Sequence, residues 1–232
     1  MARRPDESHL KEASIPDLYL ILYNCLQTVG WIAILFNTCL YLAMYQGDWK
    51  SFPGVYESTA TSLNFFQTLA VLEVVHIMLG FVKSNAFLTF MQILSRIIII
   101  WLILVPVPVT SVGPLLHIIA WSITEIIRYF YYAWSRAESP PYALLWLRYT
   151  TFIVLYPIGV LGEIISIFSA LPTIKEHSLT SLQMPNILNW SFDSYTFLVL
   201  ILIGYIPGFP QLYMHMIKQR RKYLSPEKVK TQ

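Results

Sequence analysis

Long apolar runs separated by short polar or proline-containing stretches dominate the hydrophobicity pattern of this chain. A helix of about 20 consecutive apolar residues crosses the hydrocarbon core of a bilayer. Six runs reach that length, at Leu18–Met44, Ala60–Val82, Phe87–Val105, Gly113–Trp134, Tyr142–Leu171 and Phe192–Ile217. The sequence therefore predicts an all-α, polytopic membrane protein built as a compact bundle of six transmembrane helices.

Helix-breaking residues lie between these runs and set the expected helix boundaries. They are Pro53-Gly54, Pro106 and Pro108, Pro140-Pro141, and Pro172 with Pro185. Because the connections are short and no internal repeat is visible, we expect one membrane domain over residues 18–217. A polar N-terminal segment at 1–17 and a basic tail at 218–232 flank this domain.

Basic residues are distributed unequally between the two sides of such a bundle. An even number of spans puts both termini on one side, and that side holds eleven loop and tail basic residues. The other side holds two, Lys50 and Lys175. Cytosolic segments of membrane proteins carry an excess of Lys and Arg, so the asymmetry predicts that both termini are cytosolic. The three remaining arginines, Arg96, Arg128 and Arg148, fall within spans.

The composition agrees with a chain that faces lipid. Hydrophobic residues make up 56% of it and charged residues 12%, whereas soluble domains carry about 25% charged residues. Two cysteines support neither a disulfide framework nor a zinc site. The sequence also contains no glycine-rich phosphate loop or nucleotide fingerprint. We therefore expect no metal, no cofactor and no nucleic-acid partner.

The basic tail contains a candidate targeting signal. Lys228 and Lys230 occupy the fifth and third positions from the C-terminus, and this spacing is similar to a dilysine retrieval signal of endoplasmic reticulum membrane proteins. The tail therefore favours that membrane. The alternative is a polybasic patch that binds anionic lipid headgroups.

Three carboxylates, Glu73, Glu125 and Glu163, lie within the spans together with the three arginines. Charged groups at membrane depth are costly and usually functional. Glu125 and Arg128 are three residues apart and share a helix face, so they form either an internal ion pair or part of a charged cavity open to the cytosol. Glu73 and His76 have the same spacing, and we interpret that pair as structural.

Tyr156 and Glu163 are the strongest candidates for chemistry. Seven residues separate them, which is about two turns and about 10 Å of helix, so both lie on one face, with Tyr149 one heptad earlier. Pro157 leaves the carbonyl of Ile153 without its helical donor, and a kink there would turn the phenol toward the bundle centre. A carboxyl and a phenol in apolar surroundings suit general acid–base catalysis. The alternative is a packing tyrosine and a glutamate paired to an arginine.

Several long segments, in this order, carry a family resemblance. They are LEVVH at Leu72–His76, QILSRI at Gln92–Ile97, WSITEIIRY at Trp121–Tyr129, RYTTFIVLYPIGVLGE at Arg148–Glu163, ALP at Ala170–Pro172, and PGFPQLYMHMIKQRR at Pro207–Arg221. The chain resembles the (3R)-3-hydroxyacyl-CoA dehydratases of very-long-chain fatty acid elongation, also called the protein-tyrosine-phosphatase-like family.

The resemblance implies an enzyme of the endoplasmic reticulum membrane that dehydrates (3R)-3-hydroxyacyl-CoA to trans-2-enoyl-CoA, the third step of each elongation round. Its partners would be the very-long-chain 3-hydroxyacyl-CoA substrate, membrane lipid, and the condensing enzyme, ketoreductase and enoyl reductase of the same cycle. The family's catalytic tyrosine and glutamate fall on Tyr156 and Glu163. The reaction requires no metal or redox cofactor.

Dehydration needs a base for the C2 proton and an acid for the leaving 3-hydroxyl. We expect Glu163 to act as the base and Tyr156 as the acid, and the reverse assignment stays open. Candidate substrate-binding residues are Arg96, Arg128 and Arg148, which would steer the CoA phosphates at the cytosolic mouth, together with Tyr149.

The sequence excludes one other function and leaves two alternatives to a dehydratase. A phosphatase is excluded because Ile77 stands where the nucleophilic cysteine is required and Lys83 where arginine is required. The main alternative is a non-enzymatic lipid-binding scaffold or a small transporter. A transporter would favour repeat-related, broken helices around a midplane site, and the sequence has no such internal symmetry.

Overall fold

The computed structural model describes residues 15–108, 110–181 and 191–225, and within these ranges it contains helices and no β-strand. The predicted all-α class is therefore confirmed. The α-helices are α1 (Ile15–Met44), α2 (Val55–Leu69), α3 (Leu72–Met78), α4 (Ala86–Ile98), α5 (Gly113–Ala137), α6 (Tyr142–Thr150), α7 (Phe152–His177) and α8 (Ser194–Tyr223). A 3₁₀ helix, η1 (Trp49–Gly54), precedes α2, and a π-helix, η2 (Ile99–Leu104), continues α4.

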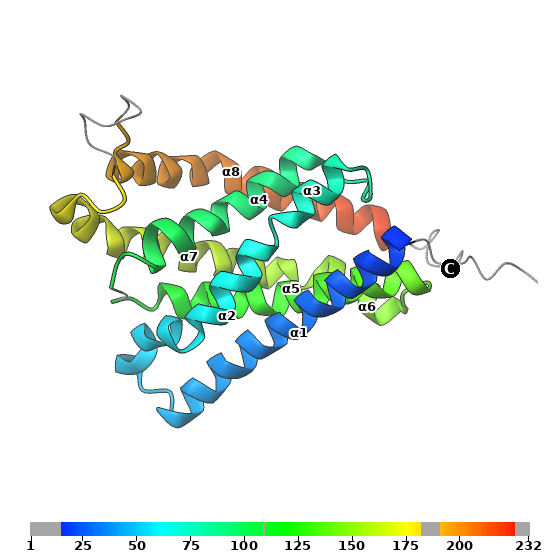
Figure 1. Ribbon diagram of the computed structural model, residues 1–232, viewed down its shortest axis with the longest axis horizontal. Coiled ribbons are helices and arrows are strands. Elements are labelled where there is room, and N and C mark those ends of the chain that lie inside the picture. The colour runs from blue at the N-terminus through cyan, green and yellow to red at the C-terminus, as the bar shows by residue number, and fades with distance from the viewer. Residues whose placement is uncertain (1–14, 109, 182–190, 226–232) are drawn as a thin grey trace, which may run out of the picture.

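Helix α5 lies at the centre of an elongated bundle (Figure 1). Its most extensive contacts are with α1 on one side and α7 on the other. Helix α8 lies at the edge of the bundle and contacts α7 and α6. It buries only Ser194 and Leu198, so most of its surface faces outward.

Five segments of the described chain are long and apolar enough to cross a membrane. They are Ile15–Met44, Trp49–Met78, Ala86–Leu104, Tyr142–His177 and Ser194–Tyr223. The chain is therefore a multi-pass membrane protein. Helix α5 is long enough, at about 37 Å, but its polar residues lower its hydropathy. Among them, His117 and Glu125 are buried against neighbouring helices.

Two predicted boundaries were wrong. The second span begins at Trp49 and not at Ala60, because Pro53-Gly54 lies in the short helix η1, which leads directly into α2. The run Tyr142–Leu171 lies within one long apolar segment, Tyr142–His177, in which a turn at Thr151 with helical dihedrals joins α6 to α7. Pro172 does not end α7, because one missing N–H is tolerated near the end of a membrane helix. The helix ends instead at Ser178, which has a left-handed φ of 50°.

Some expectations fall outside the described ranges. Pro185 lies there, as do Lys228 and Lys230 of the candidate retrieval signal and most of the N-terminal segment 1–17. Helix α8 continues into the predicted tail as far as Tyr223. The division into flanking segments and one membrane domain stays a prediction.

Helices α5 and α7 cross with their backbones in close contact. A Cβ atom built on Gly162 would lie 2.7 Å from the backbone N of His117 and 2.8 Å from the carbonyl oxygen of Gly113. A Cβ on Gly113 would lie 2.4 Å from Oγ of Ser166. Small residues permit this approach between membrane helices. The crossing fixes Glu163, the next residue of α7, against α5.

Candidate active site

Glu163 is buried in α7, with 6% of its surface exposed. The indole Nε1–H of Trp121, on α5, donates to its Oε1 at 2.9 Å. The hydroxyl of Tyr205, on α8, donates to its Oε2. Both oxygens are therefore held, each from a different neighbouring helix. In the part of the chain that the structure describes, no arginine forms an ion pair with Glu163.

Tyr156 lies at the interface between α7 and α8. Its ring stacks on Phe209, with centroids 5.2 Å apart and planes inclined by 3°, and also lies 6.3 Å from the ring of Tyr213. Tyr205, Phe209 and Tyr213 are spaced four residues apart and so share one face of α8. Tyr156 and Glu163 therefore contact the same face of α8.

Pro157 removes one helical hydrogen bond beside Tyr156. It lies within α7, and the carbonyl of Ile153 loses its helical donor there. The hydroxyl of Tyr213 donates to this carbonyl at 3.5 Å. The freed acceptor is thus satisfied from α8, and this contact adds to the aromatic stacking beside Tyr156.

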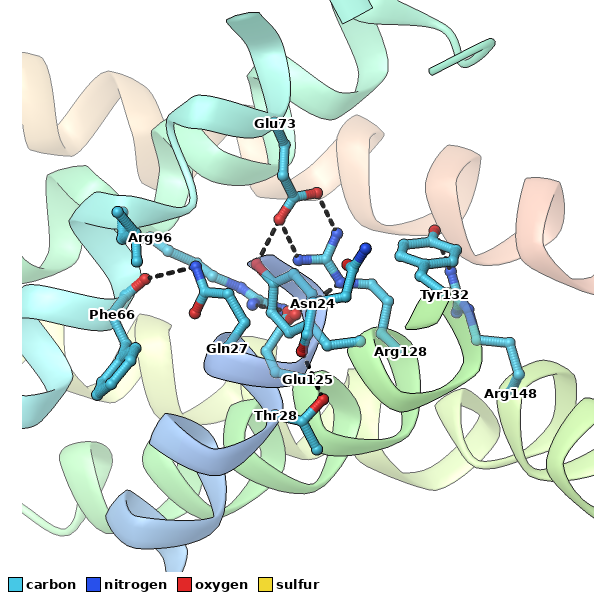
Figure 2. Close-up of polar contacts among 12 residues, drawn as sticks. Asn24, Gln27, Thr28, Phe66, Glu73, Arg96, Glu125, Arg128, Tyr132 and Arg148 are labelled. Atoms are coloured by element: carbon cyan, nitrogen blue, oxygen red, sulfur yellow. Dashed lines mark hydrogen bonds and ion pairs between the residues drawn. The ribbon is translucent and has the colours of Figure 1, made fainter. Parts of the chain in front are cut away.

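A network of charged residues joins α3, α4 and α5 (Figure 2). Arg128 donates to both oxygens of Glu73, at 2.7 and 2.8 Å, and its Nε donates to Oε2 of Glu125 at 2.6 Å. Arg96 pairs with the other oxygen of Glu125, and Tyr129 donates to Glu73. The ion-pair interpretation of Glu125 and Arg128 is confirmed, and the pair extends into a balanced cluster of two arginines and two glutamates.

Arg96 connects this network to the surroundings of Glu163. Its guanidinium carbon lies 5.2 Å from the centroid of the Trp121 ring, and the same indole donates to Glu163. Because Arg96 already pairs with Glu125, Glu163 is an additional carboxylate beside a neutral cluster.

Arg148 and Tyr149 lie in a separate group of aromatic residues. Arg148 donates to the hydroxyl of Tyr132 at 3.2 Å and lies over the rings of Tyr132 and Tyr149. Tyr149 stacks on Tyr223, with centroids 4.6 Å apart. Tyr149 lies on α6, which the turn at Thr151 joins to the helix that carries Tyr156. The buried Nε of Arg148 has no hydrogen-bond partner, and no carboxylate pairs with this arginine among the described residues.

Trp121 and Tyr205 belong to the site but are not among the residues predicted from the sequence. Spacing groups each of them with other residues of its own helix and does not connect either one to Glu163. Trp121 precedes Glu125 by four residues and so shares its polar face of α5, and Tyr205 begins the aromatic series on α8.

The cysteines of the chain lie apart from Glu163 in the sequence, on a different helix. Cys25 and Cys39, the two cysteines of the chain, are both exposed on α1. No group of three or more His, Cys, Asp or Glu residues in the described ranges is arranged to hold a metal ion.

These features define a helical multi-pass membrane protein in which a buried carboxylate is held by an indole and a phenol. The family described as protein tyrosine phosphatase-like protein, PTPLA, matches residues 67–226. This range includes α3 to α8 and all the residues of the site. The chain belongs to this family.

Curated relatives resemble the chain over most of its length. The Homo sapiens protein named very-long-chain (3R)-3-hydroxyacyl-CoA dehydratase 2 is 48% identical over 210 residues, which cover 89% of this chain and 81% of the relative. The Caenorhabditis elegans dehydratase hpo-8 is 46% identical, over 89% of this chain and 94% of the relative. The Arabidopsis thaliana dehydratase PASTICCINO 2 is 40% identical, over 91% and 95%. No solved structure matches the chain significantly.

Proposed function

We propose that this protein is a very-long-chain (3R)-3-hydroxyacyl-CoA dehydratase, a hydro-lyase of fatty acid elongation. Its family and its relatives over most of the chain support this activity. The structural observation that carries the proposal is Glu163, a buried carboxylate with both oxygens held and no arginine paired to it in the described ranges. A scaffold has no need for such a costly group.

Glu163 acts as the base in this mechanism, and Tyr156 acts as the acid. Glu163 accepts two hydrogen bonds, as a carboxylate does. It removes the C2 proton, the electron pair of that bond forms the C2–C3 double bond, and the C3–O bond breaks. Tyr156 protonates the leaving hydroxyl to give water, and the proton on Glu163 then restores the phenol. Among the described residues, the Tyr156 hydroxyl has no protein partner, so it is free to contact the 3-hydroxyl.

Arg148 and Tyr149 are the proposed binding residues for the CoA phosphates. Arg148 precedes Glu163 by fifteen residues, which corresponds to about 22 Å along helix, and the long pantetheine arm of CoA likewise separates its thioester from its phosphates. Its Nε is an unused donor, and arginine binds phosphate well. Arg96 and Arg128 are already paired with Glu73 and Glu125, so their role is to hold the helices around the site.

The membrane arrangement that supports this function has six spans. Helix α5 is the sixth, because it lies between α1 and α7 along their length and its charged groups pair with residues of α3 and α4. With both termini cytosolic, Arg148 lies toward the cytosol, where acyl-CoA is available. We also propose that the protein lies in the endoplasmic reticulum membrane. Its proposed partners are the condensing enzyme, the ketoreductase and the enoyl reductase of the elongation cycle.

The test is turnover of a 3-hydroxyacyl-CoA by the full chain purified in detergent. Wild type should form the trans-2-enoyl-CoA, and Glu163→Gln and Tyr156→Phe should each lose roughly 100-fold or more in kcat, the scale of a general acid or base. Tyr195→Phe is a matched control, because its ring lies on α8 near Lys175, outside the site. Absence of turnover in wild type would favour the scaffold or transporter, and normal rates in both variants would remove this pair from the mechanism.

A further inference from the structure

Tyr205 contacts the carboxylate that the proposed mechanism uses, although it lies on a different helix. Its hydroxyl donates to Oε2 of Glu163, while Trp121 donates to Oε1. The ring of Tyr205 also packs against the hydrophobic core. A glutamate side chain has three rotatable bonds, so two fixed donors restrict it far more than its own helix does. A general base has to be held within hydrogen-bond reach of its proton.

The two tyrosines near Glu163 have different surroundings. Tyr156 stacks on Phe209 and its hydroxyl has no partner among the described residues, whereas the hydroxyl of Tyr205 is occupied by Glu163. A phenol that is already donating to the base is poorly placed to protonate the leaving hydroxyl. One phenol is therefore available to the substrate and the other is engaged with the protein.

We propose that Tyr205 is a positioning residue for the dehydration. With Trp121 it fixes the plane of the Glu163 carboxylate so that the remaining lone pairs face C2 of the acyl chain. This inference rests on the proposed function of Glu163 as the base. It makes α8 part of the active site, because Tyr205 and Phe209 on that helix set the positions of Glu163 and Tyr156.

The donor on α5 is itself held rigidly. Trp121 is 3% exposed and stacks on His117, with ring centroids 4.4 Å apart, and Arg96 lies over its ring. Trp121 is thus a rigidly held donor to Glu163, whereas the second donor, Tyr205, lies on the more exposed helix α8. Loss of Tyr205 should release one oxygen of Glu163 and leave the other bonded, which misplaces the base without removing it.

The test measures kinetics of Tyr205→Phe, which keeps the ring and removes only the hydroxyl. We expect kcat to fall by roughly 10- to 100-fold, the range of one hydrogen bond to a charged group, while KM changes by less than about threefold because substrate contacts remain. The isotope effect from a substrate deuterated at C2 should rise, since proton removal becomes slower. Tyr195→Phe, the same change on the same helix, should leave kcat and the isotope effect unchanged.

A double-mutant cycle separates positioning from general stabilisation. Because Tyr205 acts through Glu163, adding Tyr205→Phe to Glu163→Gln should lower the residual rate by less than about twofold, whereas independent effects would multiply. Should Tyr205→Phe fail to fold, Trp121→Phe removes the other donor and should give the same fall in kcat and the same rise in the isotope effect.

Wild-type kcat in folded Tyr205→Phe, or multiplicative effects in the cycle, would overturn the proposal. If Tyr205→Phe cannot be folded, a normal isotope effect in Trp121→Phe would overturn it. If Glu163→Gln is impaired while Tyr205→Phe is not, only the positioning role falls. If both variants turn over normally, the proposed mechanism is overturned together with the positioning role of Tyr205.

Discussion

Arg128 on α5 donates to both carboxylate oxygens of Glu73 on α3, at 2.7 and 2.8 Å, across 55 positions of the chain. Helix α3 has only seven residues and buries only His76. Its attachment to the bundle therefore depends strongly on this bidentate pair. Arg128 also binds Glu125, whose other oxygen pairs with Arg96, so two arginines balance two carboxylates.

Replacing Arg128 should destabilise the protein more than replacing another arginine of the same helix. Arg128→Met leaves Glu73 and part of Glu125 unpaired in a mostly buried place, and breaking such a pair costs about 3–5 kcal/mol. Arg136→Met is the control, since its ion pair with Asp17 is partly exposed and such pairs contribute about 1 kcal/mol or less. Thermal unfolding in detergent measures the stability of both variants. If Arg128→Met lost no more stability than Arg136→Met, the role of the network in holding the helices would be contradicted.

Replacing Arg148 should weaken binding only of substrates that carry phosphates. Arg148→Gln removes the proposed phosphate donor, so KM for a 3-hydroxyacyl-CoA should rise roughly tenfold or more, the scale of a charged hydrogen bond, with less change in kcat. The matched substrate is the N-acetylcysteamine thioester of the same acid, which lacks the phosphates. Wild type and variant should process that thioester alike. A similar KM increase on both substrates would show that Arg148 supports the fold instead.

The close crossing of α5 and α7 predicts a contrast between two glycines. Gly162→Ala would push a methyl group to within 3 Å of the α5 backbone, so it should lower both thermal stability and turnover by separating Trp121 from Glu163. Gly159→Ala meets Ala120 at an ordinary 3.5 Å and should be tolerated. Thermal unfolding and kcat of the two variants test this, and equal stability would mean that the helices can separate without cost.

The six-span arrangement predicts where tags at the two ends are accessible. With α5 as a span, epitope tags at both termini should be digested by protease added to sealed microsomes, because both face the cytosol. A tag inserted after Lys50, between α1 and α2, should be protected until detergent is added. Opposite accessibility of the two terminal tags would mean an odd number of spans and would exclude α5 as the sixth.

Much of the helical pattern could be predicted because hydrophobic length alone determines it. The end of the first span at Met44 and the start of α5 at Gly113 agree with the expected runs. The turn at Thr151 could not be predicted, since the backbone there keeps helical dihedrals and neither proline nor glycine lies next to it. Pro172 was expected to end the helix because proline is a strong local breaker. The helix continues through it, because the surrounding bundle accommodates the missing hydrogen bond.

The charged network was predictable only within one helix. Glu125 and Arg128 are three residues apart, so spacing alone places them together. The pairing of Arg96 with Glu125 depends on how α4 is rotated against α5, and no pattern inside either helix specifies that rotation. For the same reason Tyr205 could not be connected to Glu163, because the two lie 42 positions apart on helices whose register is set by packing.

The buried polar face of α5 has a consequence for biogenesis. Alone in lipid this helix would expose His117, Glu125 and Arg128, so it is a poor substrate for independent release from a translocon. Helix α1 is made before it and α7 after it, and these two cover most of its length. Glu73 on α3 and Arg96 on α4, which are also made before α5, neutralise Arg128 and Glu125, so the charged groups of α5 find their partners in helices that have already been made, and α7 packs against α5 afterwards.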